Sequence, residues 1–226
     1  RGYFAGPLAR DSMGLAVLGG CLYIFGGQGP GGQVFPGVNQ GSGYFSDILR
    51  YCPGSGGGGL GAWEDLTPAS FGDAPGGRWG HGLAAVNGML VVFGGFSGMG
   101  YMTVNDLYGF DPQEGRWRRL DGLASGSGPA RRDSPGMVAT RGRIYLFGGS
   151  FFTGLVLSMP QADLWGLDAP RQVDLDSGSG LFVFVDLYDW DTLRLPPGTT
   201  FPLDEPLRLC TSFLPCQLSI VAPAPD

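Results

Sequence analysis

The sequence predicts an all-β protein built from three repeats, each containing four short strands. Its 226 residues include 43 glycines and 18 prolines, a composition that favours short strands and turns over long helices. An eighteen-residue pattern also occurs three times without a gap. The copies begin at Arg10, Arg78 and Arg132 and read RDSMGLAVLGGCLYIFGG, RWGHGLAAVNGMLVVFGG and RDSPGMVATRGRIYLFGG. Such a regular repeat is the first feature that the fold has to explain.

The first two strands of each repeat form a predicted hairpin. A short apolar run is followed by a turn containing Gly20, Gly88 or Gly142, and then by a second apolar run that ends in phenylalanine. These runs are too short for helices and too apolar for a sheet that is wet on one face, so we expect strands buried on both faces. A glycine pair follows, which allows positive φ and a close approach of neighbouring sheets. The pairs are Gly26 and Gly27, Gly94 and Gly95, and Gly148 and Gly149.

The third and fourth strands follow after a loop. The third is predicted at 47–51, 106–111 and 163–168, and each begins with an aspartate whose side chain can close a turn. The fourth has the pattern Trp-x-x-Leu and contains Trp63, Trp117 or Trp190. Arg78 follows Trp63 by the same number of residues along the sequence as Arg132 follows Trp117. The linker into the next repeat therefore has a fixed length.

This spacing divides the chain into consecutive units. Residues 1–8 form a stub, 9–66 the first repeat, 67–120 the second, and 121–195 the third with an insertion at 169–189. Residues 196–226 are either a proline-rich tail or the start of a degenerate fourth repeat.

The glycine pair after an apolar strand, the later Asp-Leu-aromatic sequence and the tryptophan resemble the kelch repeat of β-propellers. The resemblance covers residues 7–195 and implies three four-stranded antiparallel blades around an axis. The aligned arginines Arg10, Arg78 and Arg132 are interpreted as braces between blades, bonding to carbonyls or to an aspartate such as Asp106, rather than as a binding cluster. Closed propellers have about four to eight blades, so we expect residues or chains outside this sequence to complete the ring.

Charge and cysteine content narrow the classes of partner. The net charge of −6 and the lack of a basic run argue against nucleic acid, and glycines interrupt the most apolar window, 144–159, so no membrane span is predicted. The four cysteines have no CxxC spacing. Cys21 is interpreted as a free thiol at a strand start, and whether Cys210 and Cys216 pair is left open.

Catalytic residues are scarce. The only histidine, His81, lies within the repeat and is interpreted as a structural residue between blades. One histidine is too few for a typical zinc or copper site, and galactose oxidase, a kelch-propeller enzyme, needs more than one for its copper. The iron-dependent specifier proteins of plants also resemble kelch propellers, but their Glu-Asp-Cys spacing has no match here. No catalytic residue, metal ligand or cofactor is therefore predicted, and an enzyme or small-ligand binder that uses the central mouth is the alternative.

Apolar residues collect instead in the loops after the glycine pairs, which should all leave one face of the propeller. Large apolar side chains in loops mark contact surfaces unless they fold back over the blade edges. The sequence thus predicts a protein-interaction module or scaffold subunit, with a cytoskeletal or other multi-subunit assembly as partner and a cytoplasmic or cytoskeletal location favoured over secretion. The predicted partner-binding residues are Phe35, Tyr44, Phe45, Phe96, Met99, Tyr101, Phe151, Phe152 and Leu155.

Overall fold

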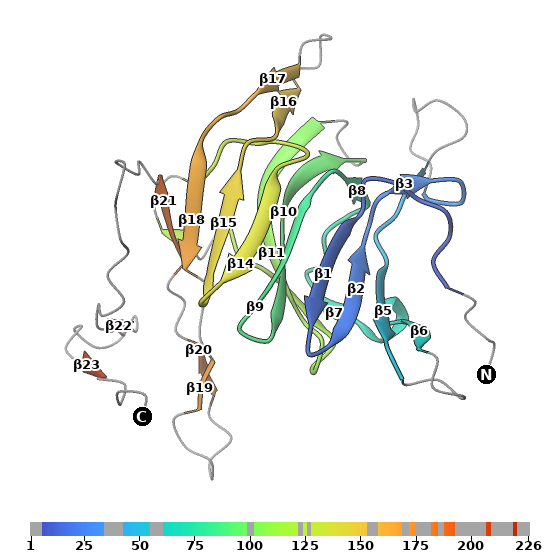
Figure 1. Ribbon diagram of the computed structural model, residues 1–226, viewed down its shortest axis with the longest axis horizontal. Helices are drawn as coiled ribbons and strands as arrows, with labels where there is room; N and C mark the ends of the chain where they lie inside the picture. Colours follow the sequence, from blue (N-terminus) through green and yellow to red (C-terminus); the bar gives the residue numbers. More distant parts are fainter. Residues whose placement is uncertain are drawn as a thin grey trace.

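The computed structural model describes most of the chain up to Asp168 and short paired strands beyond it (Figure 1). The described residues are 6–33, 43–54, 61–98, 102–121, 124–125, 128–152, 158–168, 172–174, 182–184, 188–192, 207–208 and 219–220. Within these ranges the chain is all-β, apart from one 3-10 turn at Thr67–Ala69. None of these segments forms a helix long and apolar enough to cross a bilayer.

The first blade contains the four predicted strands. They are β1 (Gly14–Leu18), β2 (Cys21–Phe25), β5 (Ile48–Cys52) and β6 (Ala62–Asp65), hydrogen-bonded in that order. All three pairings are antiparallel, and the β1–β2 register places Leu18 opposite Cys21 across the predicted glycine turn. Gly19 and Gly20 have φ values of 58° and 77°, which explains why this turn takes glycine.

The second and third blades repeat this order. The second is formed by β9 (Gly82–Val86), β10 (Met89–Ser97), β11 (Met102–Asp111) and β12 (Arg116–Arg119), with β7 (Phe71–Gly72) and β8 (Arg78–Trp79) at its edges. The third is formed by β14 (Gly136–Thr140), β15 (Arg143–Phe147), β18 (Leu164–Asp168) and β21 (Tyr188–Thr192), with β13 (Ala124–Ser125) beside β21.

Shorter hairpins extend from the blades. The segments after the glycine pairs carry β3 (Gln28–Gly29) with β4 (Gly43–Tyr44), and β16 (Ser150–Phe152) with β17 (Ser158–Pro160). In the second blade β10 itself continues through Gly94 and Gly95, where the register shifts. The insertion at 169–189 contains β19 (Gln172–Asp174) and β20 (Phe182–Phe184), and β22 (Leu207–Arg208) pairs with β23 (Ser219–Ile220).

The blades pack face to face, and their first strands lie side by side. β9 contacts both β1 and β14, and Figure 1 shows the three sheets in sequence order. One apolar core lies between the first and second blades and includes Phe25, Leu83 and Trp117. A second lies between the second and third blades and includes Phe93, Ile144 and Leu146. Most of the buried apolar surface thus belongs to the contacts between blades.

The prediction that Cys21 is a free thiol is wrong, because Cys21 and Cys52 form a disulfide. Leu22 pairs with Tyr51 in the β2–β5 ladder, so the next position places the two cysteines opposite one another, with their Cα atoms 4.3 Å apart. The corresponding position of the third blade holds an Arg143–Asp168 ion pair. Disulfides persist mainly in oxidising compartments, so this bond favours such a location over the cytoplasm.

Replacing both cysteines with alanine is expected to lower the free energy of unfolding by about 3–4 kcal/mol, because the bond closes a loop of 31 residues. Urea titration of the wild-type chain and of the double variant would measure this difference. Reductant should destabilise the wild-type chain by a similar amount and leave the double variant unchanged. Equal sensitivity of both chains to reductant would contradict the assignment.

Candidate functional site

A buried arginine organises the second blade. The Arg78 guanidinium donates from Nη1 and Nη2 to the two Asp106 carboxylate oxygens, at 2.6 and 3.0 Å. Nη1 also donates to the Gly94 carbonyl at 2.9 Å, and Nε donates to the Gly76 carbonyl at 3.2 Å. One side chain therefore ties the glycine pair to the third strand, β11, and to the incoming linker.

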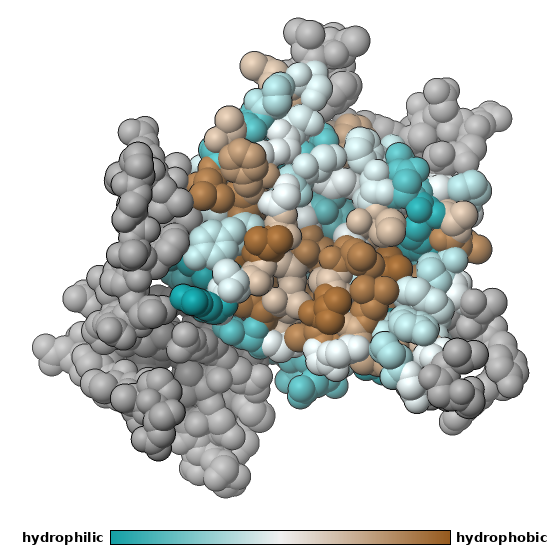
Figure 2. Space-filling view, in the orientation of Figure 1, coloured by the Kyte–Doolittle hydropathy of each residue, from teal (hydrophilic) through white to brown (hydrophobic). Residues whose placement is uncertain are grey.

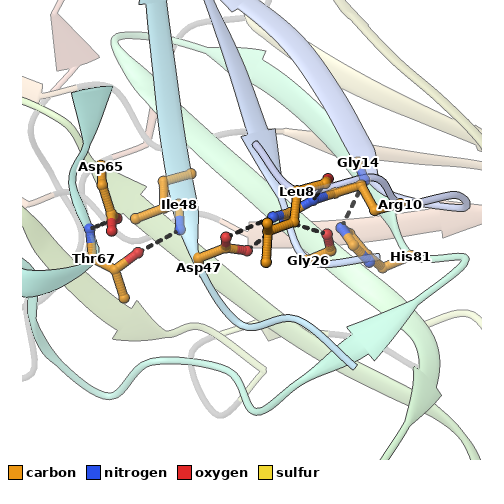
Figure 3. A network of polar contacts seen from close by, with 9 residues as sticks. All are labelled: Leu8, Arg10, Gly14, Gly26, Asp47, Ile48, Asp65, Thr67 and His81. Carbon is orange, nitrogen blue, oxygen red and sulfur yellow. Dashed lines mark hydrogen bonds and ion pairs between the residues drawn. The ribbon is translucent and has the colours of Figure 1, made fainter. Parts of the chain in front are cut away.

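The same arrangement occurs in all three blades. Arg10 binds Asp47 and the Gly26 carbonyl, as Figure 3 shows, and Arg132 binds Asp163 and the Gly148 carbonyl. The aspartates were expected to close local turns, and Asp106 was also expected as a partner of an arginine; all three carboxylates accept hydrogen bonds from these arginines. Hydrogen bonds from Arg132 hold the pKa of Asp163 at about 2, below the ordinary 3.8.

The glycine pairs connect one blade to the next. The Gly27 N–H donates to the Arg78 carbonyl at 2.8 Å, and the Gly95 N–H donates to the Arg132 carbonyl at 2.9 Å. A Cβ atom built on Gly95 would lie 2.8 Å from the Trp79 carbonyl oxygen, so only glycine fits this position without a shift. The glycine pairs thus bond to the main-chain carbonyls of the arginines across the contact between blades, whereas the arginine side chains, predicted to brace neighbouring blades, bond within their own blade.

His81 also lies at a contact between blades. Its Nε2 accepts a hydrogen bond from the Gly14 N–H at 3.1 Å (Figure 3). Its ring also packs edge-on against Phe25. Burial, and to a smaller extent the positive charge of Arg78, lower the pKa of His81 from 6.5 to about 3. A neutral histidine that accepts a backbone hydrogen bond here is a structural residue.

The three segments after the glycine pairs leave the same face of the molecule, at the top of Figure 1, where β3, the end of β10, β16 and β17 lie. We call this the loop face. At its base Phe96 stacks on Trp79 with ring centroids 5.3 Å apart, and Tyr44 contacts the edge of Phe96 at 6.4 Å. These aromatic contacts join the first loop to the second.

The second and third loops are also joined, because β11 contacts β16. Arg131 lies over the Phe151 ring, with its Cζ 4.7 Å from the ring centroid. Met102 at the start of β11 and Met159 in β17 are both exposed. The loop face is therefore continuous and carries exposed apolar side chains.

The predicted partner-binding residues take different positions. Tyr44 and Phe45 are buried, with Phe45 under the Arg10 guanidinium, and Phe96 and Phe151 are half-buried. These four residues support the bases of the loops and are not among the most exposed residues of the loop face. Phe152 lies in β16, but its side chain is outside the described part of the structure. Phe35, Met99, Tyr101 and Leu155 also lie outside the described residues.

Sequence reasoning assigned no role to Trp79 or Arg131, although both are next to the repeated arginines. Trp79 directly follows Arg78, where the other two copies have aspartate. A tryptophan at a position where the other two repeats have aspartate was the one sequence signal that could have indicated a role for Trp79. Among the described residues, no group of three or more histidine, cysteine, aspartate or glutamate side chains is placed to hold a metal ion.

Comparisons with known proteins agree with this architecture. The family model of the KLHDC2/KLHL20/DRC7 kelch-repeats domain matches residues 5–173. An N-(sulfonatooxy)prop-2-enimidothioate sulfolyase from Thlaspi arvense is 31% identical over 150 residues, which cover 66% of this chain and 38% of that protein. Kelch domain-containing protein 3 from Homo sapiens is 28% identical over 141 residues, which cover 62% of this chain and 34% of that protein. The chain thus spans little more than a third of the length of these curated relatives.

A solved structure shows the same fold. The structure of YjhT superposes with a TM-score of 0.56 at 21% sequence identity, covering 88% of this chain and 55% of that one. The blade order, the repeated arginine contacts and the family match lead to one assignment. The chain belongs to the KLHDC2/KLHL20/DRC7 kelch-repeat family and has its β-propeller fold.

Proposed function

We propose that this chain is a protein-binding module that contacts its partner through the loop face. The observation that supports this most directly is the continuity of that face, with loops from neighbouring blades in contact and Met102 and Met159 exposed on it. Exposed methionines adapt to partners of different shape and are enriched at interfaces. Kelch repeats commonly mediate protein interactions, which agrees with this choice.

The aromatic contacts at the base of the loop face make this face suitable for binding a protein partner. Trp79 and Tyr44 both pack against Phe96 below the loops, which supports the bases of the first and second loops. A rigid platform reduces the entropy that is lost on binding. Arg131 adds a cation beside Phe151, so a partner with apolar residues next to a carboxylate would match this surface.

Selection of short random peptides displayed on phage tests this proposal. We expect sequences that bind the chain to lose at least about tenfold in affinity when Met102→Ser and Met159→Ser are combined. Phe71→Ser is the matched control, because Phe71 is exposed but lies in β7 at the edge of the second blade. A selection that enriches no peptide, or peptides that are equally sensitive to Phe71→Ser, would count against the loop face.

A second candidate function comes from the sulfolyase relative at 31% identity. Under this alternative the chain would be part of a propeller enzyme or would bind a small ligand at the central mouth. The two functions differ in metal content, since an enzyme of the oxidase or iron-dependent specifier type should retain copper or iron. Elemental analysis of the purified protein separates them, with stoichiometric metal favouring the enzyme and metal-free peptide binding favouring the module.

A further inference from the structure

Methionine side chains differ sharply in their exposure. Of the six methionines, Met89 and Met137 pack against the core between the second and third blades and are partly buried. Met102 and Met159, in contrast, are 45% and 53% exposed and lie on the loop face. Access of a small oxidant to a thioether depends on exposure, so the two pairs should be oxidised at different rates.

The two exposed methionines supply much of the apolar character of the loop face. Among the side chains that the structure describes in β10, β11, β16 and β17, Met102 and Met159 are the large apolar ones that are exposed. Figure 2 shows strongly hydrophobic residues gathered over the middle of the molecule, where β1, β9 and β14 lie, whereas the loop face above them is mixed in hydropathy. A partner that makes apolar contacts with this part of the loop face therefore meets thioether groups.

Each of these methionines is paired across an antiparallel ladder. Met102 lies opposite Ser97 in the pairing of β10 with β11. Met159 lies opposite Phe151 in the pairing of β16 with β17. Residues directly opposite one another place their side chains on the same face, so the Met159 thioether is a neighbour of the Phe151 ring. The Arg131 guanidinium lies over that ring, with its Cζ 4.7 Å from the centroid, and brings N–H donors to this position.

Oxidation would change the chemistry of both methionine positions. A thioether is apolar and flexible, whereas a sulfoxide is polar, so an oxidised side chain no longer favours apolar contact. The sulfoxide oxygen is also a hydrogen-bond acceptor, and at Met159 the Arg131 guanidinium supplies donors for it. Oxidation would therefore remove the exposed apolar groups and engage the cation that lies beside them.

The cysteines indicate the surroundings in which this chemistry would occur. The Cys21–Cys52 disulfide favours an oxidising compartment for the folded chain. Within the described part of the chain no cysteine is free, so methionine is the sulfur-containing residue that is left to react there.

We propose that Met102 and Met159 form an oxidation switch that turns off protein binding at the loop face. Each thioether sulfur takes one oxygen atom from a hydroperoxide. The S–O bond forms as the O–O bond breaks, so sulfur is oxidised and the peroxide is reduced to an alcohol or, from hydrogen peroxide, to water. A methionine sulfoxide reductase reverses the step by oxidising two thiols to a disulfide and releasing the oxygen as water. This switch rests on the proposed function, because it sets the affinity of the same face for its partner.

Peroxide treatment of the purified chain tests the switch, with peptide mass spectrometry to locate the oxygen and a phage-selected peptide to measure binding. The chosen peptide contains no methionine or cysteine, so that the treatment acts on the chain alone. We expect Met102 and Met159 to gain one oxygen atom each before Met89 and Met137 do. Affinity for the peptide should then fall by about tenfold or more, and methionine sulfoxide reductase should restore it.

The combined variant Met102→Leu and Met159→Leu separates the switch from other oxidative damage. Leucine is apolar and does not react with peroxide, so peptides selected on this variant should bind it equally well before and after treatment. Met13→Leu is the matched control, because Met13 is exposed but precedes β1 and lies in none of the loops after the glycine pairs. Binding by this control should remain sensitive to peroxide.

The outcomes distinguish the switch from the proposed function. Full affinity of a wild-type chain that is oxidised at Met102 and Met159 would overturn the switch and leave protein binding by the loop face intact. An equal loss of affinity in the double-leucine variant, or oxidation of Met89 and Met137 at the same rate, would overturn it as well. A selection that enriches no peptide on the untreated chain would instead contradict the proposed function, and the switch with it.

Discussion

Replacing Arg78 with methionine is expected to lower the free energy of unfolding by about 3–5 kcal/mol, because removing one partner of a buried ion pair leaves the other charge uncompensated. The Arg78 side chain is 2% exposed, and its loss would leave the Asp106 carboxylate and the Gly94 carbonyl without their donor. Methionine keeps much of the apolar stem, so the effect would come mainly from the lost hydrogen bonds. Urea unfolding followed by tryptophan fluorescence would measure it.

Arg119→Met is the control for this experiment. Arg119 also binds a carboxylate through two nitrogen atoms, that of Asp121, but its side chain is 57% exposed. Exposed ion pairs contribute about 0–1 kcal/mol, so this variant should unfold almost as the wild-type chain does. Adding Asp106→Leu to Arg78→Met should recover part of the loss, since no buried charge then remains unpaired. Equal losses for Arg78→Met and Arg119→Met would contradict the role assigned to the repeated arginines.

The blades could be predicted from the sequence because all three repeats carry the same pattern. Apolar runs, glycine turns and the constant spacing between tryptophan and arginine each appear three times, so the comparison separates shared structure from variation. The kelch resemblance and the all-β fold are confirmed by the family match and by three sheets that each contain the four strands of a blade. An aspartate partner for Arg78 could also be anticipated, since every repeat has an aspartate after the loop that follows the glycine pair, and in the second repeat this is Asp106.

Features that occur in only one repeat were harder to predict. The Cys21–Cys52 disulfide depends on the cross-strand register of β2 and β5, and neither other blade has a cysteine at this position. The inward positions of Tyr44 and Phe45 depend on how the first loop packs against the second blade. An apolar residue in a loop has the same appearance in the sequence whether it supports the loop or contacts a partner, so burial had to come from the structure.

His81 should make stability depend on pH between about 3 and 6.5. In the unfolded chain its pKa is near 6.5, whereas burial lowers it to about 3 in the folded chain. The unfolded state therefore binds more protons in this window, so stability falls as the pH decreases from 6.5 towards 3 and is unaffected by this group above about pH 7. A difference of this size corresponds to a loss of up to about 5 kcal/mol at the acid end.

His81→Gln isolates this contribution. A glutamine oxygen can accept the hydrogen bond from the Gly14 N–H, but the side chain does not titrate. Carboxylates such as Asp163 lose their stabilising charge at low pH in both proteins, so their contribution cancels in the difference between wild type and variant. Urea unfolding at several pH values from 4 to 7 should show the variant becoming progressively more stable relative to the wild-type chain as the pH falls. A difference that stays constant across this range would mean that His81 is protonated as readily in the folded chain as in the unfolded one, and that the contact between the first two blades does not depend on a neutral imidazole.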